Sequence, residues 1–337
     1  MDSYKIDVHA HFLTPSYLDA LKKAGHVPGP DNLPFTPDWS PETHLAFMEK
    51  NNIAKSFLSI TGPGTHLIPG DDAFAREVTR EVNEFAAAVK RRYPAKFGFF
   101  ASLPLPDIEG ALAEIDYVLD ELNADGFVLM TNFHGMYFGD ARLAAVYAKL
   151  QARKATVFVH PMTPCGPTHE HTAELTPQRK RDVLPLGDTF IVGMMEYFFD
   201  TTRTIIDLLL SGTASAHPDI KFIIPHCGNA LPSVLDRALL LSASHLRHFN
   251  APPVRGPLIE LTPADVRELF SRQFYFDLAG TPMASLIHHM LSDVPFNSWA
   301  AAEGQARDIE EGLSELFREE EKEGIYHGNA ERLFGEK

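Results

Sequence analysis

Short, continuously apolar segments recur between longer segments with helical periodicity, and this alternation is the feature that most restricts the fold. None of these runs alternates strictly between polar and apolar residues, so both faces of each strand should be buried, as in a parallel sheet. Repeated strand-helix alternation predicts right-handed crossovers and a closed (β/α)8 barrel of the TIM type rather than an open sheet. The predicted strands occupy residues 5–11, 55–61, 96–103, 126–131, 155–161, 221–228 and 273–280.

The intervening segments favour helices with apolar residues three and four positions apart. Two of them are expected to begin at N-capping aspartates, Asp72 and Asp107. The 337 residues could form two domains by length alone. No linker, repeat or low-complexity tract divides the chain, so one barrel domain over residues 1–337 is predicted. The segments 23–40 and 162–187 are rich in Pro, Gly and polar residues and are expected to be loops over the active face.

The balance of charge excludes some partners. With 45 acidic and 30 basic side chains, the formal net charge is -15, which repels nucleic acid and anionic membranes. A small anionic substrate would therefore need local positive charge from a metal or an arginine. Only Cys165 and Cys227 are present, which fits a reducing cytoplasm. We recognise no signal peptide and no apolar run long enough to span a membrane.

Histidines end several of the predicted strands. His9 and His11 end the first run, His160 ends the fifth, and His226 ends the sixth. Side chains two apart in a strand point the same way, and strand ends converge on one mouth of a barrel, so these imidazoles could share a metal ion. A single strand-end histidine such as His226 is more often a core or loop residue, but four at three strand ends favour a metal centre. Histidines in loops and helices are interpreted as surface or structural residues, among them His66 and His134.

Several motifs carry a resemblance to a known family. They are KIDVHAHF near the start, VFVHP at 157–161, the segment 211–232 that contains FIIPHCGNALP, and GNAERLF at 328–334. Together they resemble the amidohydrolase superfamily, in the branch that contains aminocarboxymuconate semialdehyde decarboxylase. The segments WSPETHLAFMEKNNI, FGFFASLPLPD and FFDTTRTI look most like the methylsalicylate decarboxylase group. The resemblance implies a non-oxidative decarboxylase, a carboxy-lyase that acts on a small aromatic carboxylic acid.

The resemblance also implies a ligand set. Its metal ligands correspond to His9, His11 and His160, with an aspartate from the last strand. Asp293 matches the family motif through SDVPF at 292–296, and Asp277 in FYFDLAG is the alternative. The segment MASLIHHML runs directly into SDVPF, without the strand that relatives have there, so strand eight is expected to be truncated.

Catalytic roles follow from the same resemblance. Loss of a ring carboxylate requires a proton at the ring carbon, and Asp293 would supply it, while His226 would polarise or deprotonate a water or substrate oxygen. Three imidazoles and a carboxylate suit one divalent ion, with zinc as the first choice and manganese as the alternative. The ion would bind the substrate's carboxylate and a neighbouring oxygen.

Three further residues are expected to bind the substrate. Arg237 matches a family arginine that reaches across a homodimer interface to the anionic group in the neighbouring subunit, although a surface ion pair with Asp236 is the alternative. Phe296 stands where relatives place an aromatic side chain against the substrate ring. Tyr197 matches another such position, with core packing as an equal alternative.

Two other functions compete with decarboxylation. The same kind of barrel hydrolyses amides, lactones and esters with metal-bound hydroxide, although GFVLMT lacks the strand-four lysine typical of binuclear hydrolases. A non-catalytic barrel that serves as a binding protein is the second alternative, and the truncated junction at 290–293 is its only support. Assays of carbon dioxide release and of metal content would separate the three.

Overall fold

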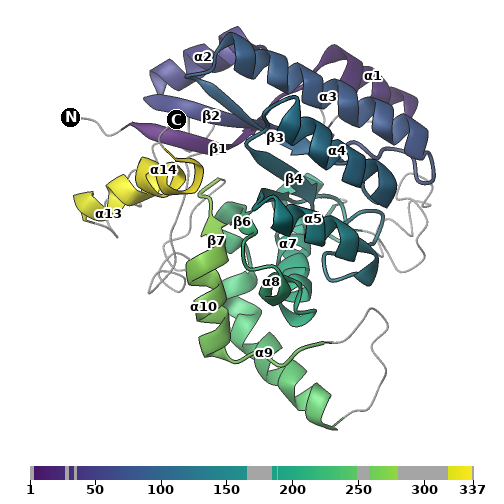
Figure 1. Cartoon of the computed structure of the whole chain (residues 1–337), viewed down its shortest axis with the longest axis vertical. Helices are drawn as coiled ribbons and strands as arrows, with labels where there is room; N and C mark the ends of the chain where they lie inside the picture. Colours follow the sequence, from purple (N-terminus) through teal and green to yellow (C-terminus); the bar gives the residue numbers. More distant parts are fainter. Residues whose placement is uncertain are drawn as a thin grey trace.

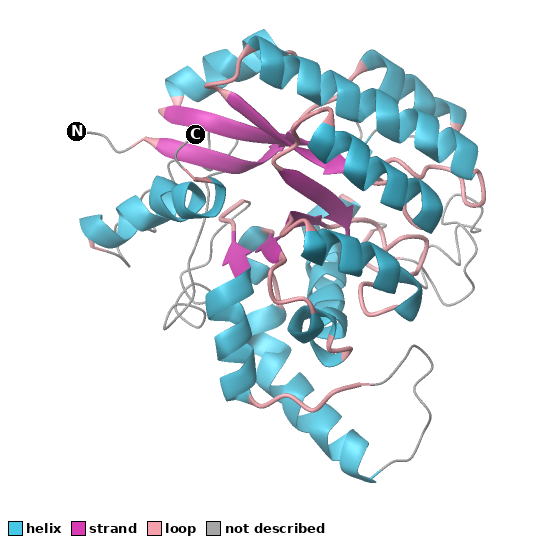
Figure 2. Cartoon of the chain, in the orientation of Figure 1, coloured by secondary structure: helices cyan, strands magenta, loops and turns pink. Residues whose placement is uncertain are grey.

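Seven parallel strands form one sheet in which each strand pairs with the next along the chain (Figure 2). The computed structural model describes residues 4–26, 30–33, 36–164, 184–187, 189–248, 258–279 and 318–335. The strands are β1 (Lys5–His11), β2 (Ile53–Ser59), β3 (Phe97–Ser102), β4 (Gly126–Met130), β5 (Thr156–His160), β6 (Lys221–Ile224) and β7 (Phe274–Phe276).

Each strand coincides with a predicted apolar run, because side chains on both faces are buried. All six residues of β3 and all five of β4 are buried. The last two strands are shorter than predicted: β6 ends before Pro225, which has no N–H for the ladder, and β7 ends before the buried Asp277. The predicted truncated strand eight, with Asp293, falls in 280–317, outside the described residues.

Helices follow the strands and cover the outer side of the sheet (Figure 1). Asp107 caps α4 as predicted, accepting from Gly110 N at 3.0 Å. The prediction for Asp72 is wrong by one residue: Asp71 caps α3, accepting from Phe74 N at 3.0 Å, and Asp72 is the first helical residue. The longer helices are α1 (Pro15–Lys23), α2 (Pro41–Lys50), α3 (Asp72–Arg92), α4 (Ile108–Asp120), α5 (Ala144–Ala152), α7 (Val192–Leu210), α9 (Leu231–His248) and α10 (Pro263–Gln273).

Short helices complete the described fold. Near the C-terminus, Phe334 stacks on Phe57 of β2 with ring centroids 4.2 Å apart, so this end of the chain packs against the sheet. No helix among the described residues is long and apolar enough to cross a membrane. The short helices are η1 (Pro30–Asn32), η2 (Ala141–Leu143), α8 (Thr213–Ala216), η3 (His226–Gly228), α13 (Glu319–Glu323), η4 (Gly324–Gly328) and α14 (Asn329–Phe334).

The sheet curls strongly about its own axis. β1 and β7 stand at opposite ends of the pairing order. Even so, His9 Nδ1 of β1 lies 2.7 Å from Oδ2 of Asp277, the residue directly after β7. A flat sheet of seven strands would separate its edges by nearly 30 Å at about 4.8 Å per strand. The contact therefore shows a half-barrel, consistent with a distorted TIM barrel.

Candidate metal centre and active site

Three histidines meet at the carboxyl edge of the curled sheet. His9 and His11 come from the end of β1, and His160 is the last residue of β5. One nitrogen of each ring lies within 4.8 Å of one nitrogen of the other two. The ring centroids are 5.0 Å apart for His9 and His11, 5.4 Å for His9 and His160, and 4.6 Å for His11 and His160. The structure thus brings together the three imidazoles that the sequence predicts as ligands.

Hydrogen bonds fix which nitrogen of each β1 ring faces the centre. His9 Nδ1 is bound to Asp277, and His11 Nδ1 lies 3.2 Å from Ser59 Oγ of β2. Both rings therefore have Nε2 left to offer a metal. An imidazole held through its second nitrogen by a carboxylate is a common way to orient a metal ligand.

Electrostatics also suit a metal. Burial first, and then the neighbouring imidazoles, hold the pKa values of His11 and His160 well below the usual 6.5. These two rings are therefore neutral, which is the form that binds a cation. Burial alone would lower the pKa of His9, but the adjacent Asp277 outweighs it and raises that pKa. The buried His160 Nδ1 has no hydrogen-bond partner among the described residues. These residues fit a divalent ion bound by nitrogen ligands.

Asp277 is a carboxylate bound directly to the ring of one of these histidines. Its side chain is fully buried, and Oδ2 is bound to His9. Its Oδ1 accepts from His226 N at 2.8 Å and from Ala279 N at 3.0 Å. Burial would raise the pKa of Asp277, but His9 lowers it below the usual value. With its oxygens engaged in this way, Asp277 orients His9 and fixes the backbone after β6.

His226 lies beside the three ligands. Its ring centroid is 5.1 Å from that of His9, and burial, with a smaller effect of His9, lowers its pKa to about 4. The backbone at His226 has φ 56°, a left-handed conformation that the bond from its N–H to Asp277 supports. Its Nδ1 is buried without a partner in the described structure. A neutral imidazole is thus available next to the metal group.

A half-buried carboxylate, Asp31, belongs to the site although no sequence motif marks it. It comes from η1, within the segment predicted only as a loop. It accepts from Gly62 N at 3.1 Å and from the Thr61 hydroxyl, whose oxygen lies 3.5 Å from His160 Nε2. Burial raises the pKa of Asp31 to about 6 against the opposing effect of its hydrogen-bond donors. No motif marks this residue, because it reaches the site through a loop.

Of the other predicted site residues, Tyr197 and Arg237 are among the described residues. Tyr197 of α7 is 4% exposed, and its hydroxyl lies 3.3 Å from Asp31 Oδ1. The structure therefore puts Tyr197 at the edge of the site. Arg237 is exposed on α9. Asp293 and Phe296 lie outside the described residues.

A curled parallel sheet with a histidine cluster at its carboxyl edge defines the class of metal-dependent α/β-barrel enzymes. The amidohydrolase family model matches residues 6–275, and the chain belongs to this family. This confirms the predicted superfamily.

Two relatives of this chain are named as decarboxylases. The chain is 36% identical over 279 residues to decarboxylase yanB of Aspergillus niger, covering 82% of this chain and 69% of the relative. It is 34% identical to the 6-methylsalicylic acid decarboxylase acuB of Aspergillus aculeatus, covering 82% and 76%. The fold is also similar to that of a dihydroxybenzoic acid decarboxylase from Polaromonas sp. JS666, solved with manganese and an inhibitor. That likeness has a TM-score of 0.73, 23% identity, and 98% and 97% coverage.

Proposed function

We propose that this chain is a metal-dependent, non-oxidative decarboxylase of a small aromatic carboxylic acid similar to 6-methylsalicylate. The observation that carries the proposal is the meeting of His9, His11 and His160 at the carboxyl edge of the sheet. The relatives named as decarboxylases, among them a 6-methylsalicylic acid decarboxylase, set the reaction class.

Zinc is the proposed ion, and manganese is the alternative that the Polaromonas structure favours. When bound, the divalent ion supplies a Lewis acid that orients and polarises the substrate's carboxylate and a neighbouring oxygen. His9, His11 and His160 would hold it, with Asp293 as the proposed carboxylate ligand. Asp277 is the less favoured ligand because its oxygens already bind His9 and two backbone N–H groups.

Residues of the chain must also transfer one proton to the substrate. Protonation of the ring carbon must precede the breaking of the C–C bond, and Asp293 is our proposed acid. His226, neutral through burial, can accept a proton from a water or from a substrate hydroxyl. Phe296 is proposed to pack on the substrate ring. Tyr197, bound to Asp31, would border the same space.

We also propose a homodimer. Apolar side chains are exposed on α7 and α9, two helices in contact with each other. Covering them with a second copy would bury surface that is unfavourable in water and would bring Arg237 of α9 to the partner's site. The exposed side chains include Met194 at 60%, Phe199 at 51%, Leu240 at 71% and Leu241 at 53%.

Three further properties complete the proposal. Residues 280–317 are proposed to contribute the truncated eighth strand of the barrel. The chain is proposed to act as one domain in the cytoplasm, on the basis of its two cysteines, of which Cys227 is buried. Fractionation of the source cells with an antibody against this chain would test the compartment.

The decisive experiment is a substrate panel with metal-loaded protein. Salicylate, 6-methylsalicylate, dihydroxybenzoates and isoorotate are incubated separately, and loss of the carboxylate is scored by mass and by carbon dioxide release. We expect turnover of at least one aromatic acid and its abolition by His9→Ala. Acid release from a lactone panel, without carbon dioxide, would replace the proposal with a hydrolase. No turnover together with no metal after dialysis would indicate a binding protein.

A further inference from the structure

Three hydrogen-bonded side chains connect the exposed Asp72, through the buried His66, with the half-buried His134 in the loop after β4. Asp72, the first residue of α3, has 55% of its side chain exposed, and its Oδ1 lies 3.0 Å from Nε2 of His66. His66 Nδ1 lies 2.9 Å from Nε2 of His134, and the His66 side chain is only 3% exposed. A buried imidazole thus bridges an exposed carboxylate and a second imidazole.

The far end of this line reaches a pocket at the carboxyl ends of the strands. His66 and His134 line it together with Met130 and Met162. Met130 is the register partner of His160 in the parallel pair of β4 and β5. Register partners present their side chains on the same face, about 4.8 Å apart, so Met130 faces the same interior as His160. The pocket and the metal group are therefore adjacent on one face of the sheet.

The backbone around His134 holds its ring in place. His134 has φ 50°, in the left-handed region that few residues with a side chain adopt. It sits in a turn between Phe133 and Met136, which bond to each other at 2.9 and 3.0 Å. Asn132 Oδ1 accepts from Gly135 N at 3.1 Å and closes the turn. This turn fixes the position of the His134 ring, whose Nε2 lies 2.9 Å from Nδ1 of His66.

Decarboxylation requires a supply of protons, which hydrogen-bonded side chains can deliver. Each turnover converts an aromatic carboxylate and one proton into the arene and carbon dioxide. The proton comes from the solvent, yet His9, His160 and Asp277 are all buried. Whichever acid protonates the ring carbon must be reloaded through the protein.

We propose that Asp72, His66 and His134 form a proton relay from the solvent to the pocket beside the metal histidines. The proposal rests on the decarboxylase function proposed above. A solvent proton taken up at Asp72 passes to His66 Nε2 while His66 Nδ1 releases its proton to His134 Nε2. His134 then releases its other ring proton into the pocket. Each ring gains one proton and loses one, so charge balances, and the rings return to the starting tautomer before the next transfer.

The test compares His66→Gln, His134→Gln and Asp72→Asn with a matched control, Glu77→Gln, an exposed carboxylate on the same helix. Carbon dioxide release is measured in dilute buffer. The relay variants should lose between about tenfold and about 100-fold in kcat with unchanged KM and metal content, while the control stays at the wild-type rate. The solvent deuterium isotope effect on kcat should rise in the same three variants.

A second measurement separates a relay from a merely structural tie between α3 and the loop after β4. Raising the concentration of a morpholine-based buffer, which binds metals weakly, should restore kcat in the His66 and His134 variants. A structural role would instead lower the melting temperature and leave the loss unrescued, and this outcome overturns the relay. Wild-type kcat in all three variants overturns it as well. A wild-type chain that decarboxylates nothing removes the proposed function and the relay together, whereas an active wild type with unaffected variants removes the relay alone.

Discussion

At the scale of single residues, the centre depends on a division of labour between imidazoles and one carboxylate. His11 and His160 are held neutral by burial, whereas His9 is tied to Asp277. A ligand ring that is already oriented loses less freedom when it binds a metal. The carboxylate also increases the basicity of the ring that it holds.

Replacing Asp277 tests whether its carboxylate supports metal binding by orienting His9. Asp277→Asn keeps the shape but removes the charge that orients His9, and metal affinity should fall by between about tenfold and about 100-fold. Competition with a coloured chelator measures the change. Asp38→Asn, at an exposed loop position, serves as the control. Equal affinities of the two variants would show that Asp277 does not support the metal.

The raised pKa of Asp31 predicts a pH dependence of stability. In the unfolded chain this carboxyl has a pKa near 3.8, and in the folded chain about 6. Folding therefore favours its protonated form, and the associated stability is present below pH 4 and lost as the pH rises through about 6. Relative to Asp31→Asn, the metal-free wild type should lose up to about 3 kcal/mol over this range. Urea unfolding at several pH values measures the difference, and a constant difference would contradict the assignment.

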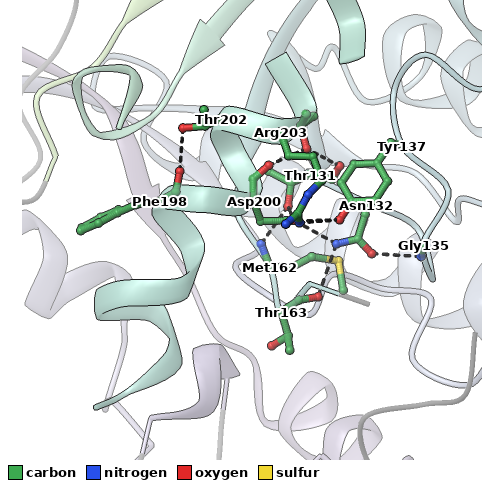
Figure 3. A network of polar contacts seen from close by, with 11 residues as sticks. Thr131, Asn132, Gly135, Tyr137, Met162, Thr163, Phe198, Asp200, Thr202 and Arg203 are labelled. Atoms are coloured by element: carbon green, nitrogen blue, oxygen red, sulfur yellow. Dashed lines mark hydrogen bonds and ion pairs between the residues drawn. The ribbon is translucent and has the colours of Figure 1, made fainter. Parts of the chain in front are cut away.

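At the scale of elements, a buried acceptor fastens α7 to the loops after β4 and β5 (Figure 3). Asp200 of α7 is 0% exposed and accepts from Thr131, Tyr137 and Arg203 at 2.5, 2.6 and 2.7 Å. Thr131 in turn donates its backbone N–H to the carbonyl of His160 at 2.9 Å. The helix therefore also fixes the end of the strand that carries a metal ligand.

This network predicts that Asp200 contributes more to the free energy of unfolding than Arg203 does. Asp200→Ala leaves several buried donors without an acceptor and should cost about 3–5 kcal/mol of unfolding free energy. Arg203→Gln should cost less than about 1 kcal/mol, because that side chain is 53% exposed. Urea denaturation measures both. Similar losses in the two variants would mean that Asp200 is not the centre of the network.

The elements also show which parts of the molecule can be predicted from sequence. Strands buried on both faces leave continuous apolar runs, so all seven described strands were expected near their observed positions. Histidines at the ends of those runs predicted the centre for the same reason. Asp31 and His66 reach the interior from loops, where position depends on contacts far apart in sequence, and no local pattern records such contacts. His66 and His134 were expected to be ordinary surface or structural residues, whereas the structure joins them to Asp72 and to an interior pocket.

At the scale of the whole molecule, charge and apolar surface act together. The chain carries a net charge of -15, and the proposed substrate is an anion. Long-range repulsion should slow its approach, and added salt should screen that repulsion. We expect kcat/KM for an aromatic acid to rise when moderate sodium chloride is added. The affinity of the protein for a neutral ester of the same acid should not change with salt. A fall in kcat/KM with salt would indicate local attraction that dominates the global field.

The exposed apolar face of α7 and α9 predicts the assembly. Leu240→Asp places a charge in the proposed interface and should convert the dimer to a monomer in sedimentation equilibrium. Lys154→Asp, at an exposed turn elsewhere, is the control. Activity should fall with dissociation if Arg237 serves the partner's site. A wild-type monomer at all concentrations would contradict the dimer.

The bond between His9 and Asp277 spans 268 positions of the chain. A fragment that ends before β7 therefore lacks the carboxylate that orients His9, since that oxygen is synthesised 268 residues after the ring that it holds. Tight metal binding should then begin only after strands β1 to β7 have paired. Bound metal would serve as an indicator that folding has been completed.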